Sequence, residues 1–159
     1  KVVCDLDNQI SHYETDSGAS VDYYFESNKE GEIKNLKRVI TRLVQNKVPL
    51  SDITILSPNK LEGSIVRKIS KNYQIIDLTK QKTIPYNNNH PRILFSTIHA
   101  YKGLENKHII ITDLTTLEGK EIEKLLYIAI SRARIRLYLI LEEACRKEYE
   151  NFLKERLLK

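Results

Sequence analysis

Short, uninterrupted apolar runs separated by amphipathic segments constrain this chain more than any other feature. The clearest runs are residues 53–56, 109–111 and 137–141. Such runs are typical of strands that are buried on both faces of a parallel sheet. Parallel neighbours need a long crossover connection, usually a helix. The alternation therefore predicts an α/β fold with a doubly wound, mainly parallel sheet flanked by helices.

The same pattern places the individual elements. We expect strands at residues 21–26, 53–56, 74–78, 93–95, 108–114 and 137–141. We expect helices at residues 30–46, from Ser57 or Asn59 onwards, over about 15 residues before the last strand, and at 142–159. The inward-facing stripes of the first and third helices are Ile33, Leu36, Ile40, Leu43 and Val44, and Ile122, Leu125, Leu126, Ala129 and Ala133. Residues 79–92 are expected to form a polar loop, and residues 1–20 a lead-in of unclear structure.

Composition excludes several classes of function. No apolar run reaches the roughly 18–20 residues that a membrane span needs, and no signal peptide is visible. Cys4 and Cys145 lack CxxC spacing and the four histidines are scattered, so neither a disulfide framework nor a metal site is expected. These features favour a reduced, cytoplasmic setting. The net charge of +5 is compatible with a polyanionic partner without requiring one.

The sequence STIHAYKGLE, residues 96–105, places polar and charged side chains between two predicted strands. In doubly wound sheets, ligands lie beyond the carboxyl ends of the strands. There, Thr97 and free backbone N–H groups would suit phosphate oxygens, and Gly103 would let the backbone approach a ligand closely. An alternative, equally compatible with the residues, is a capped short helix followed by a solvated pair of Lys102 with Glu105.

A second segment of interest is residues 125–141, where a predicted helix ends and the last predicted strand begins. Arg132 lies at this junction, off the apolar stripe of the helix. A cation at a helix C-terminus interacts favourably with the helix dipole, which is one explanation. The other is an arginine that stabilises charge on a transferred phosphoryl group. Arg134 and Arg136 nearby leave both explanations open.

Together, the two segments resemble the fifth and sixth motifs of superfamily 1 helicases of the UvrD/Rep type. The matching residues are Thr97, His99, Lys102, Gly103, Leu104 and Glu105, followed by Tyr127, Ile128, Ala129, Ser131, Arg132 and Ala133. Residues 51–60 are similar to the strand and loop that begin the nucleotide-facing part of the same domain. The chain departs from the family at Asn106, where an aromatic residue is usual, and at Ser131, where threonine is usual.

The resemblance implies a domain organisation and partners. Residues 21–141 would form the second RecA-like motor domain, with residues 142–159 packed on it as a helix. In such helicases two RecA-like domains hold ATP with Mg²⁺ between them, and single-stranded DNA lies across both. The partners implied are therefore an N-terminal RecA-like domain and single-stranded DNA, with RNA as an alternative to DNA.

The resemblance also assigns roles to individual residues. Those assigned to nucleic acid are Thr97, His99 and Lys102. Those assigned to the nucleotide are Gly103, Glu105 and Arg132, of which Arg132 would reach the γ-phosphate as the catalytic residue. One loop would then contact both ligands and would couple the state of ATP to the binding of single-stranded DNA.

The sequence lacks the parts that ATP hydrolysis needs most. It contains no GxxxxGK[ST] phosphate loop, and the stretch from Gly63 reads as a surface helix. Asp113 ends an apolar strand as a magnesium-binding aspartate would, but no second acidic residue follows it, so we expect a structural role. We therefore expect the chain alone to be inactive and ATP and Mg²⁺ to be held mainly by the first domain.

Two alternatives to a helicase motor domain remain. One is a degenerate helicase-like module that binds nucleic acid or protein without catalysis. The other is an unrelated doubly wound enzyme that binds nucleotides or phosphate, which is disfavoured because no glycine-rich loop opens any predicted helix. The motor and the degenerate module differ in whether a phosphate loop and an acidic pair are encoded upstream.

Overall fold

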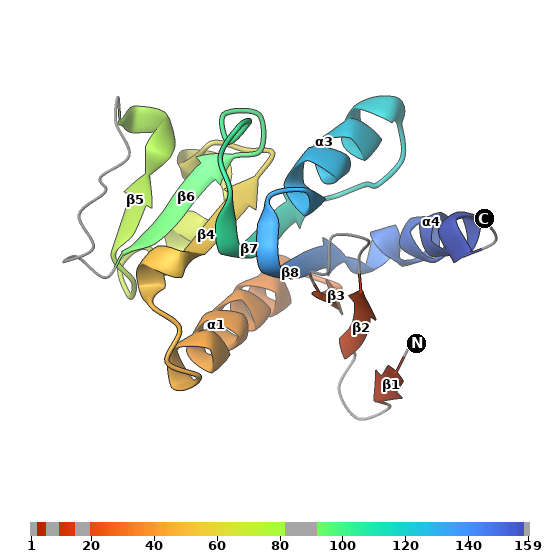
Figure 1. Ribbon diagram of the computed structural model, residues 1–159, viewed down its shortest axis with the longest axis horizontal. Coiled ribbons are helices and arrows are strands. Elements are labelled where there is room, and N and C mark those ends of the chain that lie inside the picture. The colour runs from red at the N-terminus through yellow and green to blue at the C-terminus, as the bar shows by residue number, and fades with distance from the viewer. Residues whose placement is uncertain (1–2, 6–9, 15–19, 82–91, 158–159) are drawn as a thin grey trace.

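The computed structural model describes residues 3–5, 10–14, 20–81 and 92–157. These residues form one sheet of eight strands in the order β1-β2-β3-β8-β7-β4-β6-β5 (Figure 1). The strands are β1 (Val3–Asp5), β2 (Ile10–Glu14), β3 (Ser20–Glu26), β4 (Ile53–Ser57), β5 (Ile75–Asp77), β6 (Ile93–Thr97), β7 (Asn106–Leu114) and β8 (Ala133–Glu142). The helices are α1 (Lys29–Gln45), α2 (Val66–Ile69), α3 (Lys120–Ile130) and α4 (Arg146–Leu157), with 3-10 turns at Leu50–Asp52, Leu61–Gly63, Leu78–Lys80 and Glu143–Cys145.

The six strands predicted from the sequence are the six that pair in parallel, from β3 across to β5. The doubly wound, mainly parallel sheet is therefore confirmed. In the lead-in of unclear structure, β1 and β2 add an antiparallel pair beside β3. Their assignment depends on pairing with β3, a tertiary contact that the local pattern does not reveal. Residues 82–91, most of the predicted polar loop, lie outside the described residues.

Side chains of the central strands alternate between two hydrophobic cores on opposite faces of the sheet. Ile110 of β7 and Ile140 of β8 point into the core beneath α1 and α2. Ile109 and Ile111 of β7 point into the other core, which α3 and α4 cover. Figure 1 shows α1, in orange, and α3, in cyan, on opposite sides of the sheet. Burial on both faces explains why these strands are continuously apolar.

Helix α1 lies within one residue of its predicted bounds. The Asn28 side chain caps it by accepting a hydrogen bond from the Gly31 N–H at 2.8 Å. Leu36 and Ile40 on its inner stripe are fully buried. Val44, which was predicted to share that stripe, is 47% exposed. That expectation was wrong because Val44 lies about 100° round the helix from the buried Leu43, outside the face that contacts the sheet.

The predicted helix after β4 is mostly absent. Ser57, a candidate cap, is instead the last residue of β4, and α2 begins only at Val66 and has four residues. The Ser57 hydroxyl is engaged by donating to the Asp113 carboxylate at 2.6 Å. The conformation of the segment between β4 and α2 is therefore determined by a tertiary contact and not by the helical period of its sequence.

The two later helices are shorter than predicted because β8 is longer. Ala133, placed on the apolar stripe of the third helix, instead begins β8 and pairs with Asn106 of β7. Helix α3 accordingly has 11 residues. At its other end β8 continues to Glu142, so α4 begins at Arg146. Tyr149 of α4 is buried against Tyr23 and packs the C-terminal helix against β3.

Truncation of Ile110 tests the importance of the buried face of β7. The side chain is fully buried, so Ile110→Ala is expected to lower the free energy of unfolding by about 2–5 kcal/mol. Ile135→Ala is the matched control, because Ile135 lies on β8 but is 50% exposed, and its cost is expected to stay below about 1 kcal/mol. Urea denaturation measures both. Equal losses would contradict the assignment of Ile110 to the core.

Candidate functional site

The segment 98–105 connects opposite edges of the sheet. It leaves β6 at the carboxyl end, Thr97, and enters β7 at the amino end, Asn106. Strand β4 lies between β6 and β7 and is parallel to both, so the segment crosses over β4. At the start of the crossover, the Ile98 N–H donates to the Ser57 carbonyl at 3.0 Å. We call residues 98–105 the crossover.

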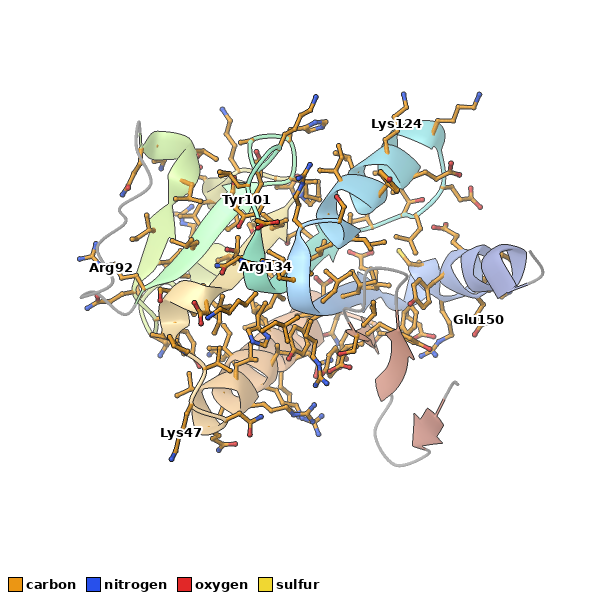
Figure 2. The ribbon with its side chains drawn as sticks, viewed as in Figure 1. Lys47, Arg92, Tyr101, Lys124, Arg134 and Glu150 are labelled. Atoms are coloured by element: carbon orange, nitrogen blue, oxygen red, sulfur yellow. The ribbon has the colours of Figure 1, made fainter. Side chains whose placement is uncertain are left out.

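Tyr101 fastens the middle of the crossover to β4. Its side chain is 2% exposed, and its hydroxyl lies 3.3 Å from that of Thr54. Figure 2 labels Tyr101 over the central part of the sheet. Burial raises the pKa of Tyr101, opposed by the hydrogen bond to Thr54; the charge of Glu105 raises it further and that of Arg132 lowers it. Tyr101 was not among the predicted site residues, although a tyrosine within an otherwise polar motif is a usable signal.

Thr97 and His99 lie at the carboxyl edge of the sheet. The Thr97 hydroxyl oxygen accepts a hydrogen bond from the Ala100 N–H at 3.2 Å, and its carbonyl accepts one from the Tyr101 N–H at 3.1 Å. The first bond is the N-cap bond of the alternative prediction and the second is one α-helical i to i+4 bond, but residues 98–103 form turns and do not continue as a helix. His99 is exposed, as is Lys102 further along the crossover. The Thr97 hydroxyl proton stays available to a ligand.

Gly103, Glu105 and Arg132 lie at the amino edge. The two motifs are joined there because the Asn106 N–H donates to the Arg132 carbonyl at 3.1 Å. Arg132 is half-buried, and its Nε is buried without a hydrogen-bond partner among the described residues. Glu105 is exposed and lies 3.7 Å from the guanidinium of Arg134. Glu105 therefore pairs with Arg134, and the predicted pair of Glu105 with Lys102 is not found among the described residues.

The structure separates three arginines that the sequence left equivalent. Arg136 is held on β3, since its Nε donates to the Ser20 hydroxyl at 2.7 Å and its guanidinium lies 3.7 Å from Asp22. Arg134 pairs with the exposed carboxylate of Glu105. Arg132 alone of the three keeps a buried Nε without a partner in the described chain. It is therefore the arginine with unused donors at this edge.

Asn106, one of the two departures from the family pattern, has a structural role. Its side-chain amide donates to the Ser51 carbonyl at 3.0 Å and to the Thr54 hydroxyl at 2.9 Å. These bonds tie the start of β7 to the start of β4. An aromatic ring could not make them. Here the amide holds the amino edge together.

Residues 57–60 lie at the carboxyl edge, opposite Arg132. Ser57 is directly paired with Thr97 across β4 and β6. The loop therefore lies beside Thr97, because the carboxyl ends of parallel strands lie at one edge. Its likeness to a nucleotide-facing segment stays a prediction.

Asp113 anchors the segment between β4 and α2. Its carboxylate accepts hydrogen bonds from the Ser57 hydroxyl at 2.6 Å, the Ser64 hydroxyl at 2.5 Å and the Ile65 N–H at 3.1 Å. Asp113 has a positive φ of 64°, within an irregularity of the β7–β8 pairing that turns the side chain toward these donors. This geometry agrees with the structural role expected from the sequence.

Two further features concern metals and membranes. Within the described ranges, no three His, Cys, Asp or Glu side chains gather as a metal site would require. None of the helices in the described part of the chain is long and apolar enough to cross a membrane.

Comparisons with known proteins bear on the family and the fold. Residues 92–140, which contain both motifs, match the model of the UvrD-like helicase C-terminal domain family. The fold is similar to the C-terminal domain of a possible DNA helicase from Lactobacillus plantarum WCFS1, with a TM-score of 0.58, 17% identity, and coverage of 79% of this chain and 74% of that one. It is also similar to the C-terminal part of the Fun30 ATPase domain, with a TM-score of 0.56, 16% identity, and coverage of 77% of this chain and 44% of that one. No curated protein sequence matches the chain.

The resemblance drawn from the two motifs is therefore confirmed. Residues 92–140 match the UvrD-like helicase C-terminal domain model, and the sheet around them has the RecA-like fold of the helicase and ATPase domains to which it is similar.

Gly103 is required for its backbone conformation. Its φ is +87°, and a Cβ added there would meet nothing within 4 Å. Gly103→Ala is thus expected to lower the free energy of unfolding by about 1–2 kcal/mol through backbone strain alone. Gly63→Ala is the matched control, since a Cβ there meets only the Asn59 Cβ at 3.8 Å. Urea denaturation compares them, and equal stability of the two variants would contradict the strain.

His108 makes stability depend on pH. Burial lowers its pKa below the ordinary 6.5, opposed by Asp52, and its Nδ1 has no partner among the described residues. A depressed folded-state pKa contributes stability above 6.5 that is lost as pH falls through the folded value. His108→Gln is expected to remove part of the loss of unfolding free energy between about pH 7.5 and about pH 5. His99→Gln, at an exposed imidazole, should keep the wild-type profile; an unchanged profile in the His108 variant would refute the assignment.

Proposed function

We propose that this chain is the second motor domain of an ATP-dependent superfamily 1 DNA helicase. The observation that carries the proposal is the crossover, which joins the edge bearing Thr97 and His99 to the edge bearing Glu105 and Arg132 within eight residues, 98 to 105. A first RecA-like domain would supply the phosphate loop and the Mg²⁺ ligands that this sequence lacks. The proposed setting is the cytoplasm.

The amino edge suits the triphosphate of a nucleotide. Arg132 has a guanidinium whose buried Nε is unused in the described chain, and a guanidinium fork matches phosphate oxygens. The open space beside Gly103 leaves its backbone accessible to a ligand. The exposed carboxylate of Glu105 can accept hydrogen bonds from nucleotide hydroxyls. ATP, when bound, would supply the phosphoryl group, and Arg132 would stabilise the charge that develops on it.

The carboxyl edge suits single-stranded DNA. The exposed ring of His99 offers a face on which a base can stack. The hydroxyl of Thr97 can donate to a phosphate oxygen, and the exposed ammonium of Lys102 can lie near the backbone. The two edges would be coupled because hydrogen bonds to Ser57 and Thr54 hold the crossover on β4. A movement of Arg132 on nucleotide binding would then be transmitted through the crossover to the bound single-stranded DNA.

The decisive test is ATP hydrolysis by the two-domain motor that contains this chain, with and without single-stranded DNA. Arg132→Ala is expected to lower the DNA-stimulated kcat by about 10³-fold or more, the range found for arginines that stabilise phosphoryl transfer. Arg134→Ala, at the neighbouring exposed arginine, is the control and should lose far less. Circular dichroism checks that both variants stay folded.

Other outcomes discriminate the alternative. Full turnover in the Arg132 variant would remove Arg132 from the nucleotide site. Absence of turnover in the wild-type two-domain protein would favour the degenerate, non-enzymatic module. The chain by itself should show no turnover, because it has no phosphate loop.

A further inference from the structure

A groove with a volume of about 880 Å³ lies at the carboxyl edge, outside the residues assigned so far. Its walls are the first turn of α1, the segment 59–71 and the end of β7. Its charged lining residues are Lys29, Glu62, Arg67, Lys68, Lys71 and Asp113. None of them has a role in the proposed nucleotide site or in the proposed contacts of the crossover with DNA.

Three cations in the groove lack acidic partners. Arg67, Lys68 and Lys71 are exposed, and none has an ion pair within the described ranges. By contrast, Lys29 is bonded to two glutamates and Glu62 to a lysine outside the groove. The three free cations lie within five positions of the chain and repel one another. This repulsion falls when an anion binds between them.

The wall that carries these cations is held in place. The carboxylate of Asp113 accepts hydrogen bonds from the Ser64 hydroxyl and the Ile65 N–H. Val66 and Ile69 of α2 are fully buried in the core beneath. Because both oxygens of Asp113 are occupied by donors, its charge is compensated within the protein. The groove therefore presents fixed backbone and free positive charge.

The groove continues from the edge that bears Thr97. Ser57 pairs with Thr97 across β4 and β6, and its hydroxyl accepts a hydrogen bond from the Asn59 N–H at 3.0 Å. Asn59 lines the groove. A single strand of DNA lying over Thr97 would thus enter the groove at Asn59, two residues beyond Ser57.

We propose that this groove binds the sugar–phosphate backbone of single-stranded DNA and lengthens the surface begun by Thr97 and His99. The proposal rests on the proposed function, since it names the path of the same strand. Arg67, Lys68 and Lys71 neutralise consecutive phosphates, and Asn59 lies at the junction of the two surfaces.

The test is binding of fluorescent oligo-dT of increasing length to the 159-residue chain, followed by anisotropy at several salt concentrations. The triple variant Arg67→Ala, Lys68→Ala, Lys71→Ala is expected to bind a long oligonucleotide at least about tenfold more weakly. The slope of log K against log salt should fall by about 2, at about 0.7 for each phosphate that the variant no longer neutralises. Short oligonucleotides that reach only Thr97 and His99 should lose little affinity.

A matched control removes three charges elsewhere. Lys34, Lys37 and Lys147 are exposed and outside the groove, so their triple alanine variant should keep wild-type affinity. Thermal unfolding checks that both triple variants fold, and Lys71→Glu alone supplies a milder variant with the same expected direction. Inorganic phosphate is added as a competitor, because it would bind if the groove were a site for free anions.

The outcomes separate the two proposals. Equal affinities of the two triple variants, with weaker binding by Thr97→Ala, would overturn the groove and leave the proposed function standing. Phosphate binding lost in the groove variant without any change in oligonucleotide affinity would also overturn it. No binding of DNA by the wild type would overturn both proposals.

Discussion

The crossing of β4 by the segment 98–105 is the constraint on which the rest of the structure depends. Strand β4 is buried on both faces, and the Thr54 hydroxyl would be left without a partner there. Tyr101 and Asn106 both reach that hydroxyl, and an unpaired buried hydroxyl would cost about 1–3 kcal/mol. The same bonds fix the crossover on the sheet. The satisfaction of one buried hydroxyl therefore helps to hold the crossover over β4.

As a consequence of this crossing, the motif residues are divided between the two edges of the sheet. The carboxyl edge holds Thr97, His99 and the basic groove, whereas the amino edge holds Glu105 and Arg132. The general rule that ligands lie beyond the carboxyl ends of the strands covers only the first set. In the proposed function, the second set faces the nucleotide, and a first domain would complete that site. Parallel strands make the separation unavoidable, because each crossover must return to the opposite edge.

Sequence patterns predicted the long elements well and the short ones poorly. All six parallel strands and α1 were predicted, because burial on both faces and a 3.6-residue period leave strong local signals. The helix after β4 was not, because the Ser57–Asp113 hydrogen bond joins residues 56 positions apart. Ala133 was misplaced because pairing with β7 draws it into a strand. Each error arose where a distant contact overrode the local preference.

By itself, the sequence determined the fold class and the two helicase-like motifs, since apolar periodicity and motif spacing are properties of neighbouring residues. The tertiary structure alone decided which arginine keeps a free donor, which edge each motif residue occupies, and that Arg67, Lys68 and Lys71 line one groove. These facts depend on strand order and on pairs of residues far apart in the chain. A local pattern carries no information about such pairs, because many strand orders would bury the same apolar residues equally well.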